Sequence, residues 1–274
     1  MFSAPIRFVG SDMVATPLEA EMKSFAAKND LDISLNMRGS RLGLEDLGAQ
    51  AGDLGLLVFA EGDTRPGPEF SSSVVGYMTA VFVVPQSVPL VQLHYAQLAG
   101  VYGASELNNF KRWSELGVSG NWAVRGITAV AATRREGLAI DLFRFSVLQK
   151  PEFKPTVAMF DEKSRALARI SGEEGGIALV SSPPPEGSGL KVLLLAKGER
   201  DVAYGPTSEN LHTGDYPLRL PVHLVFRKSE ARRLSFVIRH LLADETMPML
   251  LAAGVVPLPV QARNQLIFDL ENLR

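Results

Sequence analysis

The sequence predicts an α/β protein that begins with a parallel sheet covered by helices. Apolar segments typical of strands lie at 6–10 (IRFVG), 32–37 (DISLNM) and 53–59 (DLGLLVF). The two segments between them, 15–30 and 39–52, instead carry apolar residues at helical spacing. Strands that alternate with helices are the signature of a parallel sheet with helices on its faces. No internal repeat or low-complexity tract interrupts this order.

The first helix has clear starting signals. Thr16 is a candidate N-cap, Pro17 fits the first turn, and Glu19 completes a capping box. Apolar residues then recur at helical spacing, at Leu18, Met22 and Phe25. The second helix follows a Gly-Ser pair at 39–40.

The rest of the chain continues as strands and helices bounded by glycine and proline. Residues 61–73 are polar and rich in turn formers, so we expect a loop there. We expect strands at 74–85, 126–132, 175–182 and 191–196, and one within 213–228. We expect helices at 89–103, around Trp113, at 138–150, at 229–245 with Ser229 as a cap, at 247–254 and at 261–274.

Composition excludes several classes of function. The 274 residues are 46% hydrophobic, so one large core or two modest cores can form. The net charge of −2 gives no overall basicity that would favour nucleic acid, and a local basic patch stays open. There is no cysteine, which rules out disulfides and thiolate chemistry. The four histidines have no metal-ligand spacing, so no metal or other cofactor is expected. No segment has the length and apolarity of a membrane span.

Three loops share one construction, in which a strand is followed by a short turn and then by a helix. They are 9–17 (VGSDMVATP), 37–43 (MRGSRLG) and 133–139 (TRREGLA). A helix start exposes unpaired N–H groups and has a partial positive charge. If the three turns meet at the carboxyl edge of the sheets, they form an anion site without a metal.

Each loop also has a plainer interpretation. Ser11, Thr16 and Ser40 can simply cap helices, and Gly10, Gly39 and Gly137 can simply make turns. The arginines of these loops can be solvated surface charges; they are Arg38, Arg41, Arg134 and Arg135.

Catalytic patterns are absent. The sequence has no nucleophile elbow, no Walker loop and no dinucleotide fingerprint. The acid pairs Glu45/Asp46 and Glu173/Glu174 are adjacent in sequence and so face different ways on a helix, which favours surface charge over acid–base chemistry. We therefore do not expect an enzyme.

The motifs, taken in order, resemble the phosphate-binding, substrate-capturing proteins of bacterial ABC transporters, a family of type 2 periplasmic binding proteins. The segments 6–12 (IRFVGSD), 37–47 (MRGSRLGLEDL) and 134–143 (RREGLAIDLF) resemble the family's anion loops. The segment 75–104, followed by WSELG at 113–117, resembles its crossover to the second lobe. Residues 175–182 (GGIALVSS) and 216–226 (YPLRLPVHLVF) resemble its late strands.

The resemblance implies two α/β lobes, each a mainly parallel sheet flanked by helices, joined by crossing hinge strands. Lobe 1 is expected at 1–84 plus 202–274 and lobe 2 at 85–201. Phosphate or a related small inorganic oxyanion would bind between them as the hinge closes. The implied ligand-binding residues are Ser11, Asp12, Gly39, Ser40, Arg134, Gly137 and Leu138.

The resemblance also implies a setting for the protein. The partner would be the membrane permease of an ABC transporter, and the binding protein would be a monomer. The location would be periplasmic or extracellular, with the secretion signal absent from this sequence.

The sequence departs from the family pattern at two places. Leu138, Ala139 and Ile140 stand where the family has Ser-Gly-Thr, and Val58 and Phe59 stand where it has an acid that accepts a hydrogen bond from protonated phosphate. Two hydroxyl donors and one acid are thus missing. Each lost hydrogen bond to a charged ligand costs about 1.5–3 kcal/mol, so the loss of all three could weaken binding by roughly a thousandfold. An alternative therefore stays open: a divergent member with an apolar cleft that binds another ligand or a protein partner.

Overall fold

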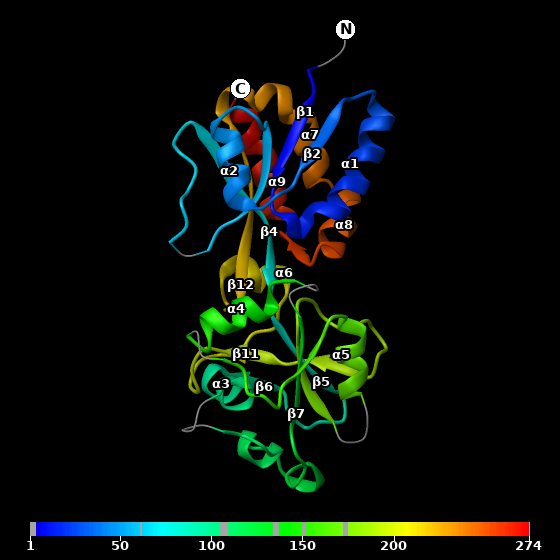
Figure 1. Cartoon of the computed structure of the whole chain (residues 1–274), viewed down its shortest axis with the longest axis vertical. Helices are drawn as coiled ribbons and strands as arrows, with labels where there is room; N and C mark the ends of the chain where they lie inside the picture. Colours follow the sequence, from blue (N-terminus) through cyan, green and yellow to red (C-terminus); the bar gives the residue numbers. More distant parts are fainter. Residues whose placement is uncertain are drawn as a thin grey trace. The chain divides into compact units, whose positions relative to one another are not determined.

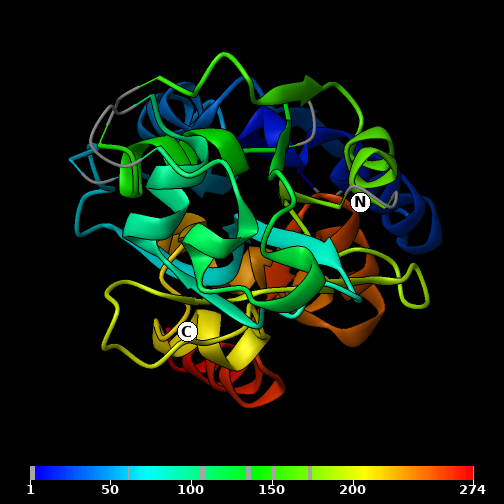
Figure 2. The same ribbon diagram turned by 90° about the horizontal axis from the view of Figure 1, so that it is seen from below.

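The computed structural model describes residues 4–60, 62–104, 109–133, 137–149, 152–171 and 175–273. The chain forms two compact units. Unit 1 comprises Met1–Tyr77 and Leu220–Arg274, and unit 2 comprises Met78–Arg219. The first and last of the described elements, β1 and α9, both belong to unit 1 (Figures 1 and 2).

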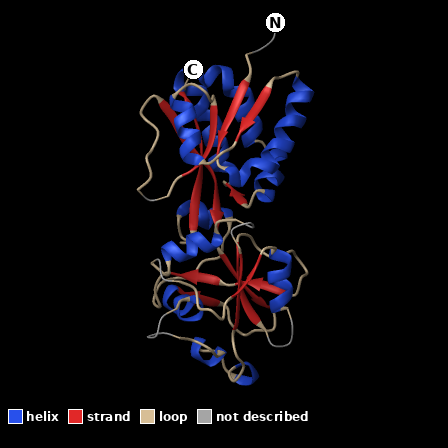
Figure 3. Ribbon diagram, in the orientation of Figure 1, coloured by secondary structure: helices blue, strands red, loops and turns tan. Residues whose placement is uncertain are grey.

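Unit 1 contains a six-stranded sheet in the order β13-β4-β12-β3-β1-β2. β1 pairs in parallel with both β2 and β3, as the sequence predicts, whereas β12 pairs with β3 in the antiparallel sense. Helices lie around these strands (Figure 3). The strands are β1 (Ile6–Gly10), β2 (Ile33–Asn36), β3 (Leu54–Val58), β4 (Phe70–Thr79), β12 (Arg219–Arg227) and β13 (Val255–Pro257). The helices are α1 (Ala15–Asn29), α2 (Ser40–Gly48), α7 (Ala231–Leu242), α8 (Met247–Ala252) and α9 (Val260–Asn272).

The core of unit 1 is made by the apolar faces that the sequence pattern predicts. The stripe Leu18, Met22 and Phe25 of α1 is buried. On the other side, Leu47 of α2 packs into one cluster with Val9, Leu57, Phe59, Phe70 and Val225 from the sheet and its connections. Burial of each of these side chains contributes about 1.5–3 kcal/mol to folding.

Unit 2 contains a five-stranded sheet in the order β10-β5-β9-β7-β8 and a small sheet of β6 and β11 (Figure 3). β7 pairs in parallel with β8 and β9, and β5 pairs with β9 in the antiparallel sense. The strands are β5 (Val81–Pro85), β6 (Gln92–His94), β7 (Thr128–Ala132), β8 (Ala158–Phe160), β9 (Gly176–Val180), β10 (Leu190–Val192) and β11 (Leu194–Ala196). The helices are α3 (Tyr95–Tyr102), α4 (Ala139–Ser146), α5 (Lys163–Ile170) and α6 (Ser208–Thr213).

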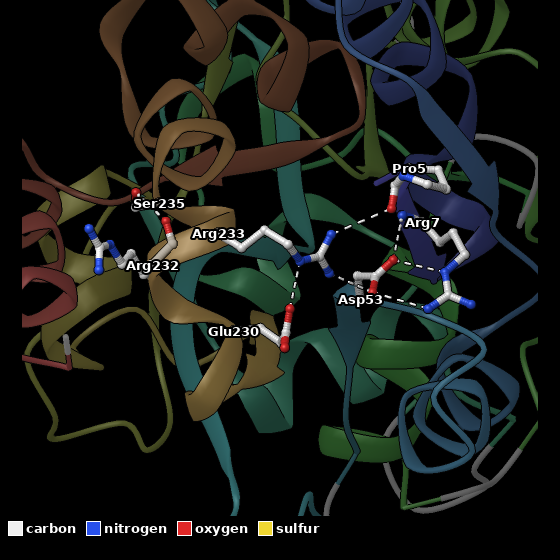
Figure 4. Close-up of polar contacts among 7 residues, drawn as sticks. All are labelled: Pro5, Arg7, Asp53, Glu230, Arg232, Arg233 and Ser235. Carbon is white, nitrogen blue, oxygen red and sulfur yellow. Dashed lines mark hydrogen bonds and ion pairs between the residues drawn. The ribbon is translucent and has the colours of Figure 1, made fainter. Parts of the chain in front are cut away.

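An ion cluster fastens α7 to the amino edge of the first sheet (Figure 4). Asp53, which precedes β3, accepts hydrogen bonds from the backbone N–H and the guanidinium of Arg7 and from Arg233, at 2.7–3.1 Å. Burial raises the pKa of Asp53, but the hydrogen bonds from Arg7 and the charge of Arg233 outweigh it and hold the pKa below its usual value. This cluster lies at the opposite end of β3 from Val58, so it supports the unit rather than the predicted site.

The predicted strand at 74–85 proves to be two strands in different units. β4 begins earlier than expected, at Phe70, inside the segment predicted as a loop. The ladder breaks at Ala80, whose backbone is bound by the return segment of the chain: Ala80 N donates to Leu218 O at 3.4 Å, and the Tyr216 hydroxyl donates to Ala80 O at 2.8 Å. β5 then joins the sheet of unit 2.

The unit boundaries differ from the predicted 84/85 and 201/202. Residues 78–84 belong to unit 2, because β5 pairs there with β9 and β10. Residues 202–219 also belong to unit 2, where Tyr204 bridges to Leu195 and Tyr216 holds Ala80. The chain therefore crosses between the units within β4 and β12, which are neighbours in one sheet.

Two predicted helix caps are wrong. α1 is preceded by a short 3-10 helix, Asp12–Val14, so its N-cap is Val14 and Thr16 lies inside it. Ser229 lies in another 3-10 turn, Lys228–Glu230, and does not cap α7. Across the described ranges, no helix combines the length and apolarity needed to cross a membrane.

Candidate functional site

The first candidate loop is held against β3 by glycine. Gly10 has φ +137°, and a Cβ there would lie 2.2 Å from the carbonyl oxygen of Leu56. The next residue, Ser11, donates its N–H to that carbonyl at 2.9 Å. The Ser11 hydroxyl accepts from Met13 N at 3.3 Å and is almost fully buried, at 3% exposure. Asp12 is exposed in the first turn of the 3-10 helix.

The second candidate loop lies directly beside the first. Gly39, with φ +118°, donates its N–H to the carbonyl of Gly10 at 2.7 Å and is the N-cap of α2. The Ser40 hydroxyl accepts a hydrogen bond from Val58 N at 2.8 Å. Because a hydroxyl can accept and donate at once, the Ser40 O–H remains available to a ligand.

Small residues allow these loops to meet. A Cβ at Gly43 would lie 2.7 Å from the Cα of Gly10, so α2 packs on the first loop at backbone distance. The structure thus brings Ser11 and Ser40 together at the carboxyl ends of β1 and β3. The neighbouring arginines do not extend this group, because Arg38 pairs with Asp46 and Arg41 with Glu45 along α2.

The position of the family's acid is occupied by Val58, which is half-buried, and by Phe59, which is a core residue. Phe59 is 4% exposed and belongs to the hydrophobic cluster of unit 1. Its ring contacts the edge of His223, with centroids 5.2 Å apart, and Arg65 lies over it at 4.9 Å. Burial, helped by the charge of Arg65, lowers the pKa of His223. The Phe59 side chain therefore packs into the core of unit 1.

Unit 2 carries the third candidate loop. Arg134 lies outside the described residues. Gly137 has φ +128°, and a Cβ there would lie 2.9 Å from the Cβ of Ser181, which directly follows β9. Leu138 is the N-cap of α4 and offers no side-chain cap, while Ala139 is buried. This helix start therefore keeps its backbone donors but lacks the side-chain hydroxyls of the family pattern.

Sequence reasoning missed four polar residues at this edge of unit 2. Thr133 follows β7 and donates to Asp161, which follows β8, at 2.9 Å. Lys163, at the start of α5, donates to the hydroxyl of Ser182 at 2.7 Å. The sequence carried no clear signal for the lysine pair, because β8 was not predicted and Ser182 falls within the strand predicted at 175–182.

The chemistry offered by these edges is hydrogen-bond donation. They present backbone N–H groups, serine hydroxyls and a lysine. Within the described part of the chain, no group of three or more His, Cys, Asp or Glu side chains is arranged to hold a metal ion.

Sequence comparison finds similarity to proteins named for phosphate binding. No protein-family model matches the chain. The phosphate-binding protein PstS of Pseudomonas aeruginosa is 23% identical over 199 residues, which cover 70% of this chain and 61% of that protein. The chain thus spans about three fifths of the length of this curated relative.

Solved structures share the fold over nearly the whole chain. A possible phosphate-binding protein from Planctomyces limnophilus superimposes with a TM-score of 0.72 at 17% identity, over 100% of this chain and 99% of that one. PstS from Borrelia burgdorferi superimposes with a TM-score of 0.69 at 13% identity, over 93% of this chain and 99% of that one. An ABC-type phosphate transport receptor from Vibrio cholerae superimposes with a TM-score of 0.65 at 16% identity, over 92% of this chain and 99% of that one. The resemblance and the two-lobed α/β fold that the sequence motifs predicted are confirmed.

Proposed function

We propose that this protein captures a small tetrahedral oxyanion, phosphate in the first place, as the solute-binding component of an ABC transporter. The observation that carries the proposal is the meeting of the loops at Gly10–Ser11 and Gly39–Ser40 within unit 1. Their backbone and hydroxyl donors are the groups that hold anions at helix starts. The names of the relatives, which refer to phosphate binding and transport, support the choice of ligand.

The proposed ligand set combines both units. From unit 1 the hydroxyls of Ser11 and Ser40 donate, with Asp12 beside them and with Gly39 as the N-cap of α2, whose own N–H is bound to the Gly10 carbonyl. Arg134 and the N–H groups of Gly137 and Leu138 donate from unit 2. Capture would proceed by a hinge closure of the kind that a permease can recognise. The protein would act outside the cytoplasm, as a monomer, by binding rather than by catalysis.

The local chemistry sets the expected selectivity. Phe59 belongs to the core of unit 1 and Val58 is apolar, so neither accepts a hydrogen bond from a partly protonated ligand. Without that acceptor, discrimination between phosphate and sulfate is expected to be small. Leu138, Ala139 and Ile140 further lower the number of side-chain donors, so affinity is expected to be modest for this class of protein.

Isothermal titration calorimetry tests the proposal. The protein is freed of bound ligand by unfolding, dialysis and refolding, and is titrated with phosphate, sulfate and molybdate. We expect saturable heat at one site for phosphate, and at least a tenfold loss in Arg134→Gln. Arg165→Gln, which removes an exposed arginine of α5, is the matched control and should bind like the parent. Absence of heat with all three anions would contradict the proposal.

A further inference from the structure

Lys163 and Ser182 bridge two strands that are not neighbours. Lys163 follows β8 and Ser182 follows β9, and in the sheet β7 lies between these strands. The hydrogen bond from Lys163 Nζ to Ser182 Oγ, 2.7 Å long, therefore spans the carboxyl end of β7. The loop that contains Arg134 and Gly137 begins at that end.

The pair also adjoins Gly137, at the described end of this loop. Gly137 packs so closely on Ser181 that a Cβ would lie 2.9 Å from the serine Cβ. Ser182 is the next residue along the chain and carries the lysine contact. The backbone donors at 137–138 and the Lys163–Ser182 pair thus belong to one edge of unit 2.

The charge of Lys163 is not neutralised by a carboxylate among the described residues. The acids nearest to it in sequence have other contacts: Asp161 accepts from Thr133, and Glu162 accepts from Ser164. Lys163 uses one of its three N–H groups on Ser182, and the Ser182 hydroxyl, acting there as an acceptor, keeps its own hydrogen. The half-buried pair therefore presents a positive charge and at least two further donors.

We propose that Lys163 and Ser182 bind the oxyanion directly and supply the donors that Leu138, Ala139 and Ile140 lack. The inference rests on the function proposed above and names two residues of that site. A lysine acts as a point charge, so it replaces directional hydroxyl donors by a charged donor that favours anions of higher charge. The ligand class is accordingly a doubly charged tetrahedral oxyanion, such as hydrogen phosphate or sulfate.

Calorimetric titration of four variants with phosphate and sulfate tests this assignment. Lys163→Met keeps the aliphatic stem and removes the charge, and should weaken binding of both anions about tenfold to a hundredfold. The affinity of Lys163→Arg should stay within about fivefold of that of the parent. The affinity of Ser182→Ala should fall about threefold to tenfold. Lys197→Met removes an exposed lysine of the same unit and should change nothing beyond twofold.

The outcomes separate the two proposals. Parent protein that binds phosphate, with Lys163→Met and Ser182→Ala both within twofold of it, would overturn the role of the pair and leave the proposed function standing. Parent protein that binds neither anion would overturn the proposed function, and this inference with it. Thermal unfolding of each variant confirms that it is folded, and Ser182→Ala provides an independent test if Lys163→Met is not.

Discussion

The Ser40 hydroxyl has two proposed roles: it accepts a hydrogen bond that supports the fold, and it donates a hydrogen bond to the anion. The variant Ser40→Ala tests each role by a different measurement. In Ser40→Ala, the N–H of Val58 loses the acceptor that lies 2.8 Å away, at a half-buried position. Leaving such a donor unpaired costs about 1 kcal/mol of folding free energy, which corresponds to a fall in Tm of roughly 2–4 °C for a protein of this size. Loss of one donor to a charged ligand costs about 1.5–3 kcal/mol, so phosphate affinity should fall about tenfold to a hundredfold.

Calorimetric titration and thermal unfolding on the same preparations measure both effects. Ser235→Ala is the matched control: this serine also bonds to the backbone, donating to Arg232 O at 3.0 Å, but it lies on α7 near the Asp53 cluster (Figure 4). It should leave affinity unchanged. If Ser40→Ala shows the lower Tm but binds phosphate within twofold of the parent, Ser40 is a structural group only and the reasoning for unit 1 fails.

Three further changes have defined expectations. Replacing Leu138, Ala139 and Ile140 by Ser, Gly and Thr should strengthen phosphate binding at least tenfold by calorimetry, because it restores two hydroxyl donors; unchanged affinity would show that this helix start does not contact the anion. Gly137→Ala forces φ +128° on a residue with a Cβ and should cost about 1–3 kcal/mol in chemical denaturation. Asp53→Asn should cost about 2 kcal/mol at pH 7. Since the folded pKa of Asp53 is lowered, this difference should be constant above about pH 4–5 and vanish as pH falls through the folded pKa; a difference that grows in acid would refute it.

Much of the fold could be predicted from local pattern. The apolar stripe of α1 and the strand pattern of β1, β2 and β3 each point to one structure, because the helix and the sheet bury the faces that their periods define. The break at Ala80 could not be predicted in this way. Residues 74–85 are mostly apolar throughout, and the backbone of Ala80 at the break is bound by Tyr216 and Leu218, which lie more than 130 residues away.

The candidate site was predictable to a similar extent. Ser11, Gly39 and Ser40 stand out because glycine and serine follow strands and precede helices. Lys163 and Ser182 do not, because their relation depends on β7 lying between β8 and β9, which is a matter of strand order rather than of sequence neighbourhood. The orientation of Phe59 could not be predicted either. The sequence alone does not say which face of the sheet its side chain joins, and in the structure it packs with Val225 and Leu47 in the core of unit 1.

The most direct measurement is a crystal structure of the ligand-free preparation soaked with phosphate at low millimolar concentration. The account predicts tetrahedral density within hydrogen-bonding distance of Ser11 Oγ and Ser40 Oγ, where the two loops of unit 1 meet. Density bound elsewhere, or clear loops at Ser11 and Ser40 with only water at their hydroxyls, would contradict it.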